Sequence, residues 1–484
     1  MPLFSTIKNF FSPDRRWPWL LLALALKLGG VVFFLIYNRA EAGSRHIALE
    51  HGDTFSYLDP IDNLLSTGHY TPDLRMPGYG AVYLLFRLVV EPIIARDLVV
   101  LLQMVLAAVA VYVGARLAQR LTGRNAAFVI VFFLLGISPY MSTLESRLCT
   151  ESFCTSALIF ACWLLLRWRD EGRKRWLLLA GALVGWAIFL RPITGVALLA
   201  LAPMAYVSTA PTLLKRWWPV VLFLLPFGVA DGIWTARNYV VNQAFHPLTN
   251  GLYYTNASGR VYWACVDLVR LYGGHSMWWD DRSHVAWFNA YDVGTGLPKN
   301  TNGLPPPDWF HTPEFNLDSL KDLSARTYHV QESAMDSAER ETLTLATVAR
   351  YRRYVDSARE HFPLRTTIGG RAMNTWNFFW QYGSAGLFFK PWAESSLPAK
   401  AMKAYQGAVY LVAIFLGTAA GLLRLFDRRS SMPLRSVGAL AVVGVLMIPL
   451  LFQLTEYRYS VPSFPFLLIL ALDQLYRWKA SLRT

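Results

Sequence analysis

Cysteine and charge are both scarce in this chain, and no segment of it repeats. Among its 484 residues are only four cysteines, and 16% of the residues are charged. Cys149, Cys154 and Cys162 lie in or beside one apolar run, whereas Cys265 lies in a more polar segment. A disulfide framework needs cysteines that can pair in one compartment. We therefore expect buried thiols and no such framework.

Apolar and aromatic residues are abundant instead. Hydrophobic residues make up 54% of the chain, which also contains 18 tryptophans and 23 tyrosines. Tryptophan and tyrosine anchor proteins at membrane interfaces. Runs long enough to cross about 30 Å of hydrocarbon lie near residues 17–38, 97–119, 125–143, 150–168, 176–190, 193–209, 217–236, 404–424, 434–453 and 458–476. We predict an all-α integral membrane protein with about ten transmembrane helices.

The net charge of +14 reflects membrane topology and does not indicate a nucleic-acid partner. Basic residues concentrate in every second connection, as in Arg116, Arg120 and Arg124 and again in Arg167, Arg169, Arg173, Lys174 and Arg175. The short connections on the other side carry only Arg147, Arg191 and Arg458. The positive-inside rule then places both termini in the cytoplasm and segments 39–96 and 237–403 outside a plasma or bacterial inner membrane. The first run is too long for a removable signal peptide and lacks a small-residue cleavage pattern, so we expect it to remain as an anchor.

This topology divides the chain into three parts. An N-terminal transmembrane module covers residues 1–236 and includes the first outer loop, 39–96. An extracytoplasmic loop region covers 237–403, and C-terminal transmembrane helices cover 404–484. Within the first loop, residues 76–94 are apolar but carry Arg87 and Glu91, which is typical of a helix lying in the interface. Within the large loop, the spacing of Leu343, Leu345, Val348 and Val355 predicts a helix over 332–361.

Polar residues gather at the outer ends of the predicted spans. Charged groups at membrane depth usually pair with one another or line a wet cavity. We therefore predict a polar cavity at the outer face, built from Asp53, Arg75, Glu145, Arg147, Glu151, Arg191, Asp231, Arg237, Asn238, Glu456, Tyr457, Arg458 and Tyr459.

Several of these segments together resemble the GT-C glycosyltransferases, specifically the bacterial relatives of protein O-mannosyltransferases in glycosyltransferase family 39 and the aminoarabinose transferases of lipid A. The first outer loop is similar in Gly52-Asp53-x-x-x-Tyr57, Gly68-His69-Tyr70 and Arg75-x-Pro77-Gly78-Tyr79. The later segments that carry the resemblance are Ser142-Thr143-Leu144-Glu145-Ser146-Arg147-x-x-x-Glu151, Leu190-Arg191-Pro192, Arg237-Asn238-Tyr239 with His246-Pro247 and Asn250-Gly251, and Glu456-Tyr457-Arg458-Tyr459-x-x-Pro462. One departure is that Asp53 has no acidic neighbour, whereas some relatives carry two adjacent acids in this loop.

The resemblance implies an enzyme that moves a hexosyl or pentosyl group from a polyprenyl-phosphate donor to a protein, lipid or glycan acceptor outside the membrane, with inversion. Asp53 is then the expected general base. The arginines expected to bind the donor phosphate are Arg237 and Arg458, followed by Arg75 and Arg191. Residues expected to shape the cavity or contact the acceptor are Tyr57, Tyr79, Glu151, Asn238 and Glu456. Membrane lipids are the remaining expected partners.

Other interpretations stay open from the residues alone. Asp53 could instead cap a helix after Gly52, and the arginines could contact lipid headgroups or pair with Glu145, Glu151 or Glu456. His51, His69 and His246 could hold a divalent metal with Asp53, but no tight ligand spacing supports one, so we expect no required cofactor. A polysaccharide polymerase or ligase would use the same cavity. A secondary transporter is less consistent, because it predicts repeats and ionisable groups near mid-bilayer, a position where only Lys27 is found.

Overall fold

A computed structural model represents the chain, and it describes residues 15–37, 46–50, 52–72, 75–207, 209–243, 245–248, 257–276, 283–290, 302–331, 336–380, 392–453 and 455–482. The chain divides into two compact units. The first comprises residues 1–250, 382–445 and 457–484, and the second comprises 251–381 and 446–456. Over the described residues the fold is helical, with one isolated β-bridge between Leu49 and Arg147 in place of any sheet.

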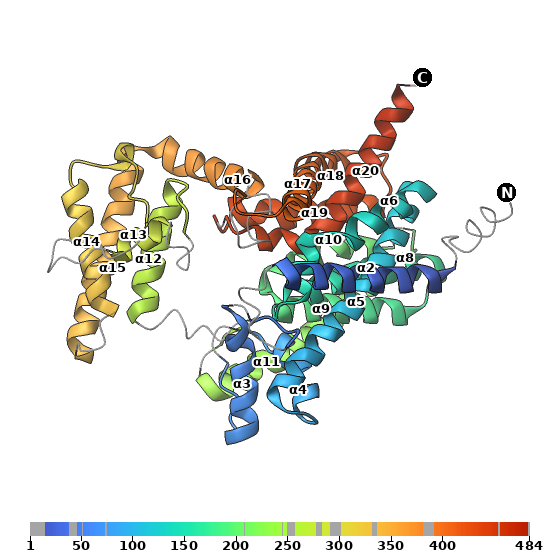
Figure 1. Ribbon diagram of the computed structural model, residues 1–484, viewed down its shortest axis with the longest axis horizontal. Helices are drawn as coiled ribbons and strands as arrows, with labels where there is room; N and C mark the ends of the chain where they lie inside the picture. The colour runs from blue at the N-terminus through green and yellow to red at the C-terminus, as the bar shows by residue number, and fades with distance from the viewer. Residues whose placement is uncertain are drawn as a thin grey trace. The chain divides into compact units, whose positions relative to one another are not determined.

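The first unit is a bundle of apolar helices and shorter connecting helices (Figure 1). α8 is deeply buried and packs against α5, α9 and α10. The helices of this unit are α2 (Arg16–Tyr37), α3 (Thr54–Thr67), α4 (Gly78–Arg87), α5 (Pro92–Thr122), α6 (Asn125–Gly136), α7 (Pro139–Glu145), α8 (Glu151–Glu171), α9 (Lys174–Leu190), α10 (Val196–Ala205), α11 (Leu213–Asn242), α17 (Leu397–Leu411), α18 (Thr418–Phe426), α19 (Met432–Leu450, whose last turn belongs to the second unit) and α20 (Phe464–Ser481). Tighter or wider helical turns form η1 (Pro192–Gly195), η5 (Val412–Gly417) and η6 (Tyr457–Ser463).

The prediction of a helical, multi-pass membrane protein is confirmed. Among the described residues, six helices are long and apolar enough to cross a membrane, and α6 with α7, bent by 51°, makes a possible seventh. The predicted spans near 193–209 and 458–476 are each interrupted at their start by a 3-10 turn, η1 and η6, that contains a proline. α9 has 17 residues, which is short for a span. The number of ten spans therefore stays a prediction.

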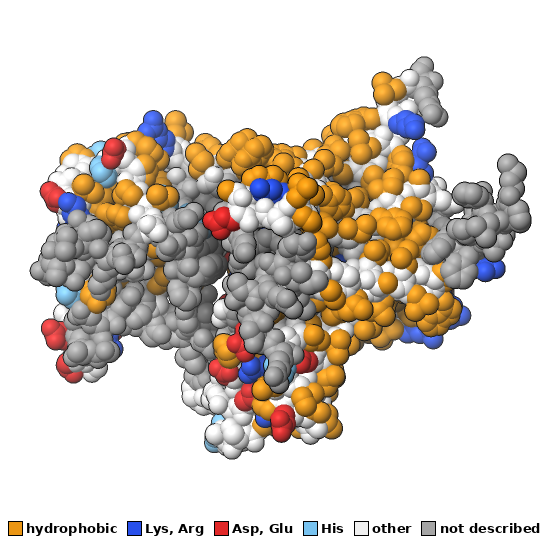
Figure 2. All heavy atoms as spheres, viewed as in Figure 1, with side chains coloured by type: hydrophobic (Ala, Val, Ile, Leu, Met, Phe, Trp, Pro, Cys, Tyr) orange, Lys and Arg blue, Asp and Glu red, His pale blue; other side chains and the backbone are white. Residues whose placement is uncertain are grey.

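Many large apolar side chains on these helices point away from the protein interior. Leu21 is 66% exposed, Ile233 68% and Leu423 54%. Figure 2 shows broad hydrophobic surface over this unit, with charged side chains gathered near α3 and α4. Such contiguous apolar surface is costly in water and suits a lipid environment.

One buried ion pair explains the mid-span Lys27. Its Nζ lies 2.7 Å from Oε1 of Glu145 and donates a 3.0 Å hydrogen bond to the carbonyl of Leu135. Both charged side chains are at most 1% exposed. The pair joins α2 to α7 and neutralises a charge that could not remain alone at this depth.

The first outer segment is fastened to α5 and to the connection before α8. The backbone amide of Ala48 donates to Asp97, and Leu49 pairs with the chain at residues 146–148 through two backbone hydrogen bonds. α3 and α4 follow, linked by Arg87, which donates to Asp62 at 2.9 Å. The helix expected over 76–94 is shorter in the structure, where α4 ends at Arg87, and its position in the membrane interface stays a prediction.

The second unit is a small helical bundle with its own apolar core. Its helices are α12 (Ala257–Leu271), α13 (His284–Ala290), α14 (Leu317–Gln331), α15 (Ser337–His361) and α16 (Gly370–Trp380), with short turns η3 (Asp308–Phe310) and η4 (Arg365–Gly369). Its buried core includes Cys265, Phe288, Phe310, Tyr351 and Tyr354. All four cysteines of the chain are buried and free.

α15 matches the helix predicted over 332–361, although residues 332–335 lie outside the described part of the chain. Leu343, Val348 and Val355 pack on the core as predicted, whereas Leu345 is 56% exposed and does not belong to the buried stripe.

Candidate active site

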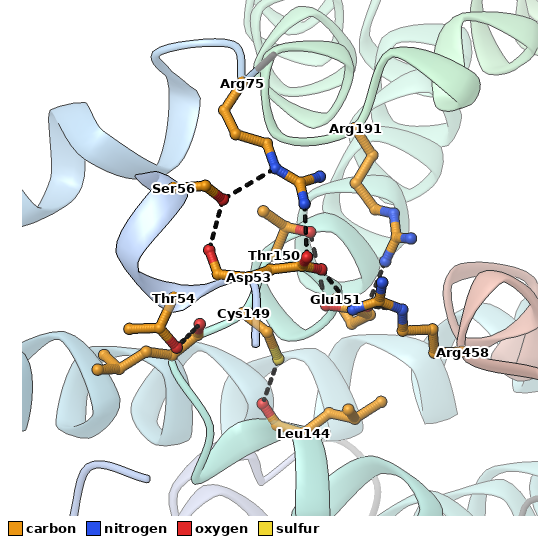
Figure 3. A network of polar contacts seen from close by, with 11 residues as sticks. Asp53, Thr54, Ser56, Arg75, Leu144, Cys149, Thr150, Glu151, Arg191 and Arg458 are labelled. Atoms are coloured by element: carbon orange, nitrogen blue, oxygen red, sulfur yellow. Dashed lines mark hydrogen bonds and ion pairs between the residues drawn. The ribbon is translucent and has the colours of Figure 1, made fainter. Parts of the chain in front are cut away.

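Asp53 lies between two arginines that come from opposite ends of the chain. Its Oδ1 accepts a hydrogen bond from Nη2 of Arg75 and its Oδ2 accepts one from Nη1 of Arg458, both at 2.6 Å (Figure 3). Ser56 donates its hydroxyl to the Asp53 carbonyl and accepts from Nε of Arg75. The Asp53 side chain is 22% exposed, so the carboxylate is held firmly but remains accessible.

The alternative role of Asp53 as a helix cap is not what the structure shows. Asp53 occupies the N-cap position of α3, but its side chain makes no capping hydrogen bond to that helix. Capping aspartates accept from the first turn, whereas this carboxylate is turned toward Arg75 and Arg458. The negative charge of Asp53 therefore pairs with the two arginines and does not cap α3.

A second layer of contacts fixes the loop that carries Asp53. Thr54 donates its hydroxyl to the carbonyl of Leu148. Gln103 of α5 donates from Nε2 to the carbonyls of Glu145 and Arg147 and accepts from the hydroxyl of Tyr79. Gln103 is fully buried, and a buried amide with both ends satisfied is a rigid connector.

Glu151 and Arg191 complete the cluster. A guanidinium nitrogen of Arg191 forms an ion pair with Oε1 of Glu151, and Nε of Arg458 lies 3.8 Å from the same oxygen. Glu151 is 1% exposed and Arg191 9% exposed. Arg191 also stacks over the Tyr459 ring, 4.4 Å from its centroid. Glu151 therefore orients arginines rather than facing solvent.

The formal charges of this cluster do not cancel. Arg75, Arg191 and Arg458 supply three positive charges, and Asp53 and Glu151 supply two negative ones. A surplus of one positive charge remains, in a place where arginine forks are already oriented. This surplus favours an anionic ligand.

Tyr57 and Tyr79 form the aromatic wall beside Asp53. Their ring centroids are 5.3 Å apart, and Arg75 lies over the Tyr57 ring at 4.8 Å. Burial raises the pKa of Tyr57 to about 12, partly opposed by Arg75. Tyr57 is therefore a neutral phenol near pH 7, able to stack or to donate a hydrogen bond but not to act as an anion.

Two of the predicted site residues, Arg237 and Asn238, form hydrogen bonds with other segments. Arg237 donates from Nη2 to the carbonyl of Tyr70 at 2.7 Å and from Nη1 to the side chain of Asn238. Asn238 is buried and donates to the carbonyl of His246. Glu456 lies just before η6 and is half-buried. Arg237 and Asn238 thus hold the end of α3 and the chain after α11 in place.

Sequence reasoning missed the connectors of the site. Gln103 and Ser56 are not among the predicted site residues. A polar glutamine inside the long apolar run 97–119 is a signal that could have identified Gln103. Tyr459 was seen, but its stacking on Arg191 was not. Within the described residues no three metal-ligating side chains converge, while His51 lies outside them.

Residues 83–234 match the family described as dolichyl-phosphate-mannose-protein mannosyltransferase. The matched part includes Glu151 and Arg191 and leaves Asp53, Arg75 and Arg458 outside it. The match confirms the resemblance to GT-C glycosyltransferases predicted from the motifs. No curated protein matches the chain significantly.

Three solved structures are similar to nearly the whole chain at low identity. One is the archaeal oligosaccharyltransferase AglB from Archaeoglobus fulgidus in complex with an inhibitory peptide and a dolichol-phosphate. It is 12% identical to this chain with a TM-score of 0.44, and the match covers 96% of this chain and 52% of the AglB chain. The Archaeoglobus fulgidus oligosaccharyltransferase tethered to an acceptor peptide is 14% identical with a TM-score of 0.46. That match covers 97% of this chain and 50% of the matched chain. ArnT from Cupriavidus metallidurans bound to undecaprenyl phosphate is 14% identical with a TM-score of 0.33. That match covers 96% of this chain and 78% of the ArnT chain. The chain thus spans about half the length of the two archaeal enzymes.

Proposed function

We propose that the Asp53 cluster is the active site of a membrane glycosyltransferase that moves a hexosyl or pentosyl group from a polyprenyl-phosphate donor to an acceptor outside the membrane. The observation that carries this proposal is the position of Asp53 between Arg75 and Arg458, within a cluster that has a net positive charge. A carboxylate and preplaced guanidinium groups are the two parts that such a transfer requires.

The donor phosphate would bind where the Asp53 carboxylate now holds the arginines. A phosphodiester carries one negative charge, which equals the surplus of the cluster. Arg75 and Arg458 would turn their forks from the carboxylate to the phosphate oxygens. Asp53 would then lose two of its charged donors and become a better base only when donor is present. Arg191, anchored by Glu151, would help to stabilise the same charge.

The chemical step then balances with the residues of this cluster. Asp53 takes the proton from the acceptor hydroxyl, and the oxygen attacks the anomeric carbon. The bond between that carbon and the phosphate oxygen breaks, and the bonding electrons leave with the polyprenyl phosphate. Attack opposite the leaving group inverts the anomeric centre. Arginines stabilise the charge that develops on the leaving phosphate.

An apolar groove in the first unit is suited to the lipid tail of the donor. It has a volume of about 310 Å³ and is lined by Pro77, Gly78, Trp186, Phe189 and Pro226 among others. Two of its lining residues are close in sequence to site residues, because Pro77 follows Arg75 by two positions and Phe189 precedes Arg191 by two. An isoprenoid chain can occupy such a groove without desolvating polar groups.

The distribution of basic residues supports an outward-facing site. Arg191 and Arg458 belong to short connections with few basic residues, and the same topology puts segment 39–96, which carries Asp53, on their side of the membrane. The cytoplasmic side is expected to hold Arg167, Arg169 and the other clusters of positive charge. Both chain termini would then be cytoplasmic.

The test is a transfer assay on the purified full chain. Polyprenyl phosphates carrying radiolabelled mannose or aminoarabinose are mixed with protein and an extracted cell-envelope acceptor fraction, and release of free polyprenyl phosphate is measured. We expect release that Arg75→Gln and Arg458→Gln strongly reduce, whereas Arg87→Gln, a matched change in the nearby pair with Asp62, does not. Sugar flux into proteoliposomes without any lipid-linked donor would overturn the proposal in favour of a transporter.

A further inference from the structure

One helix of the second unit has an exposed side that is apolar along its length. α16 and the preceding π-helical turn η4 present large apolar side chains that are between 49% and 73% exposed: Leu364, Ile368, Met373, Trp376 and Trp380. These residues recur at intervals of three to five, and the interval of five crosses the end of η4, where the helix is wider. Residues at such spacings share one helix face. We call this face the apolar stripe.

The other face of α16 packs on the interior of the second unit. Asn374 donates from Nδ2 to the carbonyl of Arg270 at 3.2 Å, and Asn377 donates from Nδ2 to the carbonyl of Gly273 at 3.4 Å. Phe378, between these two faces in sequence, is fully buried. These contacts fix the rotation of α16 about its own axis, so the apolar stripe cannot turn inward while they persist.

Arg371 connects α16 to the end of a helix that can cross a membrane. Its Nη1 donates a 2.7 Å hydrogen bond to the carbonyl of Leu450, the last residue of α19, and both residues belong to the second unit. α19 is one of the six described helices that are long and apolar enough to cross a membrane. Leu451 and Phe452, which follow α19, are exposed apolar residues as well. α16 is therefore fastened at the point where a span leaves the hydrocarbon.

The charged residues of this segment are basic. No aspartate or glutamate lies between Glu360 and Glu394 in the sequence, whereas Arg365 and Arg371 in the same segment are both exposed. Arg365 lies over the ring of Trp309, 5.0 Å from its centroid. A helix with an apolar face, exposed tryptophans and basic residues is typical of segments that lie in the headgroup region of a bilayer.

We infer that α16 is an interfacial helix that docks the second unit on the membrane leaflet at the C-terminal end of α19, with the apolar stripe in contact with lipid acyl chains and Arg365 near anionic headgroups. Trp376 and Trp380 stack with ring centroids 5.4 Å apart and planes 8° apart, which makes a paired indole anchor of the kind found at membrane interfaces. The inference concerns membrane placement and does not depend on the transfer reaction.

A second copy of the chain is a poorer occupant of the apolar stripe. A two-fold contact places the same surface of both copies against each other. It would bring Arg365 and Arg371 toward their own counterparts, and this segment supplies no carboxylate to offset them. A lipid surface with anionic headgroups offers both an apolar layer and the opposite charge.

Spin-label accessibility in the full chain tests this placement, in nanodiscs of phosphatidylethanolamine and phosphatidylglycerol. The four cysteines of the chain are buried, so one introduced cysteine can be labelled selectively. Leu364→Cys and Ile368→Cys report on the apolar stripe, and Leu345→Cys is the matched control, an exposed apolar position of α15 outside the stripe. We expect the stripe labels to collide more often with oxygen than with a water-soluble nickel chelate, at a depth of about 5–10 Å into the boundary between headgroups and acyl chains. The control label should show the reverse preference.

Removing the indole anchor should move the helix toward water. Trp376→Ser/Trp380→Ser should raise the collision rate of the Ile368→Cys label with the nickel chelate, whereas Leu345→Ser should leave it unchanged. Thermal unfolding of each variant confirms that the compared proteins are folded.

Two results would overturn the inference. Stripe labels as accessible to the nickel chelate as the control label would place this face in water. Labels shielded from both reagents would assign it to a protein contact, and dipolar coupling between labels would identify that contact as a second copy. Asp53→Asn should leave every depth unchanged, so a failed transfer reaction and a failed membrane placement give different results.

Discussion

Asp53 and Arg458 are 405 positions apart in the chain and form a 2.6 Å hydrogen bond. This bond ties the first outer segment to the connection before α20. Arg75 holds the other carboxylate oxygen, so Asp53 is shared between two donors that also suit a phosphate. The arrangement links donor binding to release of the proposed base.

Replacing Arg75 or Arg458 should lower the rate of sugar transfer more than replacing Arg237. We expect Arg458→Gln and Arg75→Gln to lower the rate of transfer by about a hundredfold or more, because each removes a charged donor to the leaving phosphate. Arg237→Gln should cost less than tenfold, since that guanidinium binds the carbonyl of Tyr70 instead. Steady-state rates of sugar transfer by the three variants, measured with the same lipid donor, test this ranking. An equal or larger loss in Arg237→Gln would contradict the assignment of the phosphate site.

Close packing at Gly78 should make it intolerant of a side chain. A Cβ at this position would lie 2.5 Å from the carbonyl carbon of Phe189 and 2.8 Å from the nitrogen of Leu190. We expect Gly78→Ala to destabilise the chain by about 1–3 kcal/mol and to reduce activity by displacing Arg191. Gly195→Ala is the matched control, because nothing lies within 4 Å of the Cβ there. Thermal unfolding and transfer rates measure both, and equal effects would argue against the contact.

The pair of Lys27 and Glu145 should be sensitive to removal of either partner. Lys27→Met or Glu145→Gln alone leaves one charge buried without its partner, which costs about 3–5 kcal/mol. The double variant Lys27→Met/Glu145→Gln should recover most of that loss. Thermal unfolding in detergent measures the four proteins. Additive losses in the double variant would show that the two charges do not stabilise one another.

The second unit should lose stability in mild acid through His284. Burial, with a smaller contribution from His275, lowers the pKa of His284 from 6.5 to about 4. Its Nδ1 accepts a hydrogen bond from the backbone amide of His275, which fits the neutral ring. Between pH 6.5 and 4 the unfolded chain binds a proton that the folded chain does not, so stability falls as the pH falls through this window.

Hydrogen exchange of α13 amides across that window measures the effect. His284→Gln should flatten the dependence on pH, whereas His361→Gln, an exposed change at the end of α15, should leave it in place. A slope that persists unchanged in His284→Gln would assign the acid sensitivity to other groups.

Local patterns in the sequence predicted much of the fold. Apolar runs located α2, α5, α8, α11 and α19, because lipid exposure requires long uninterrupted apolar stretches. Pro192 and Pro462 lie in the 3-10 turns η1 and η6, which interrupt two predicted spans at their starts. The depth of the helices that follow depends on packing against neighbours rather than on local composition. Lys27 remained unexplained for the same reason, since its partner Glu145 lies in a distant part of the chain.

The candidate site was predicted in its residue types and less well in its pairings. Asp53, Arg75, Arg191 and Arg458 were all singled out, and they do converge with Glu151. Arg237 was ranked with Arg458, because both are arginines at outer turns beside tyrosines. Only the tertiary structure shows that Arg237 binds a backbone carbonyl. The pairing of each arginine with a carboxylate depends on distances in the folded structure, which the spacing of residues along the chain does not predict.

The most direct measurement of the central claim is the single-turnover rate of sugar transfer by Asp53→Asn, compared with Asp62→Asn. Both aspartates belong to the same outer segment and both accept from an arginine, so the control reproduces the loss of an ion pair without touching the cluster. We expect Asp53→Asn to lower the chemical rate by about 10²–10⁴-fold, with donor still bound and the fold intact, and Asp62→Asn to keep a rate near that of the unchanged protein. A folded Asp53→Asn that transfers sugar as fast as Asp62→Asn would contradict the role of Asp53 as the base.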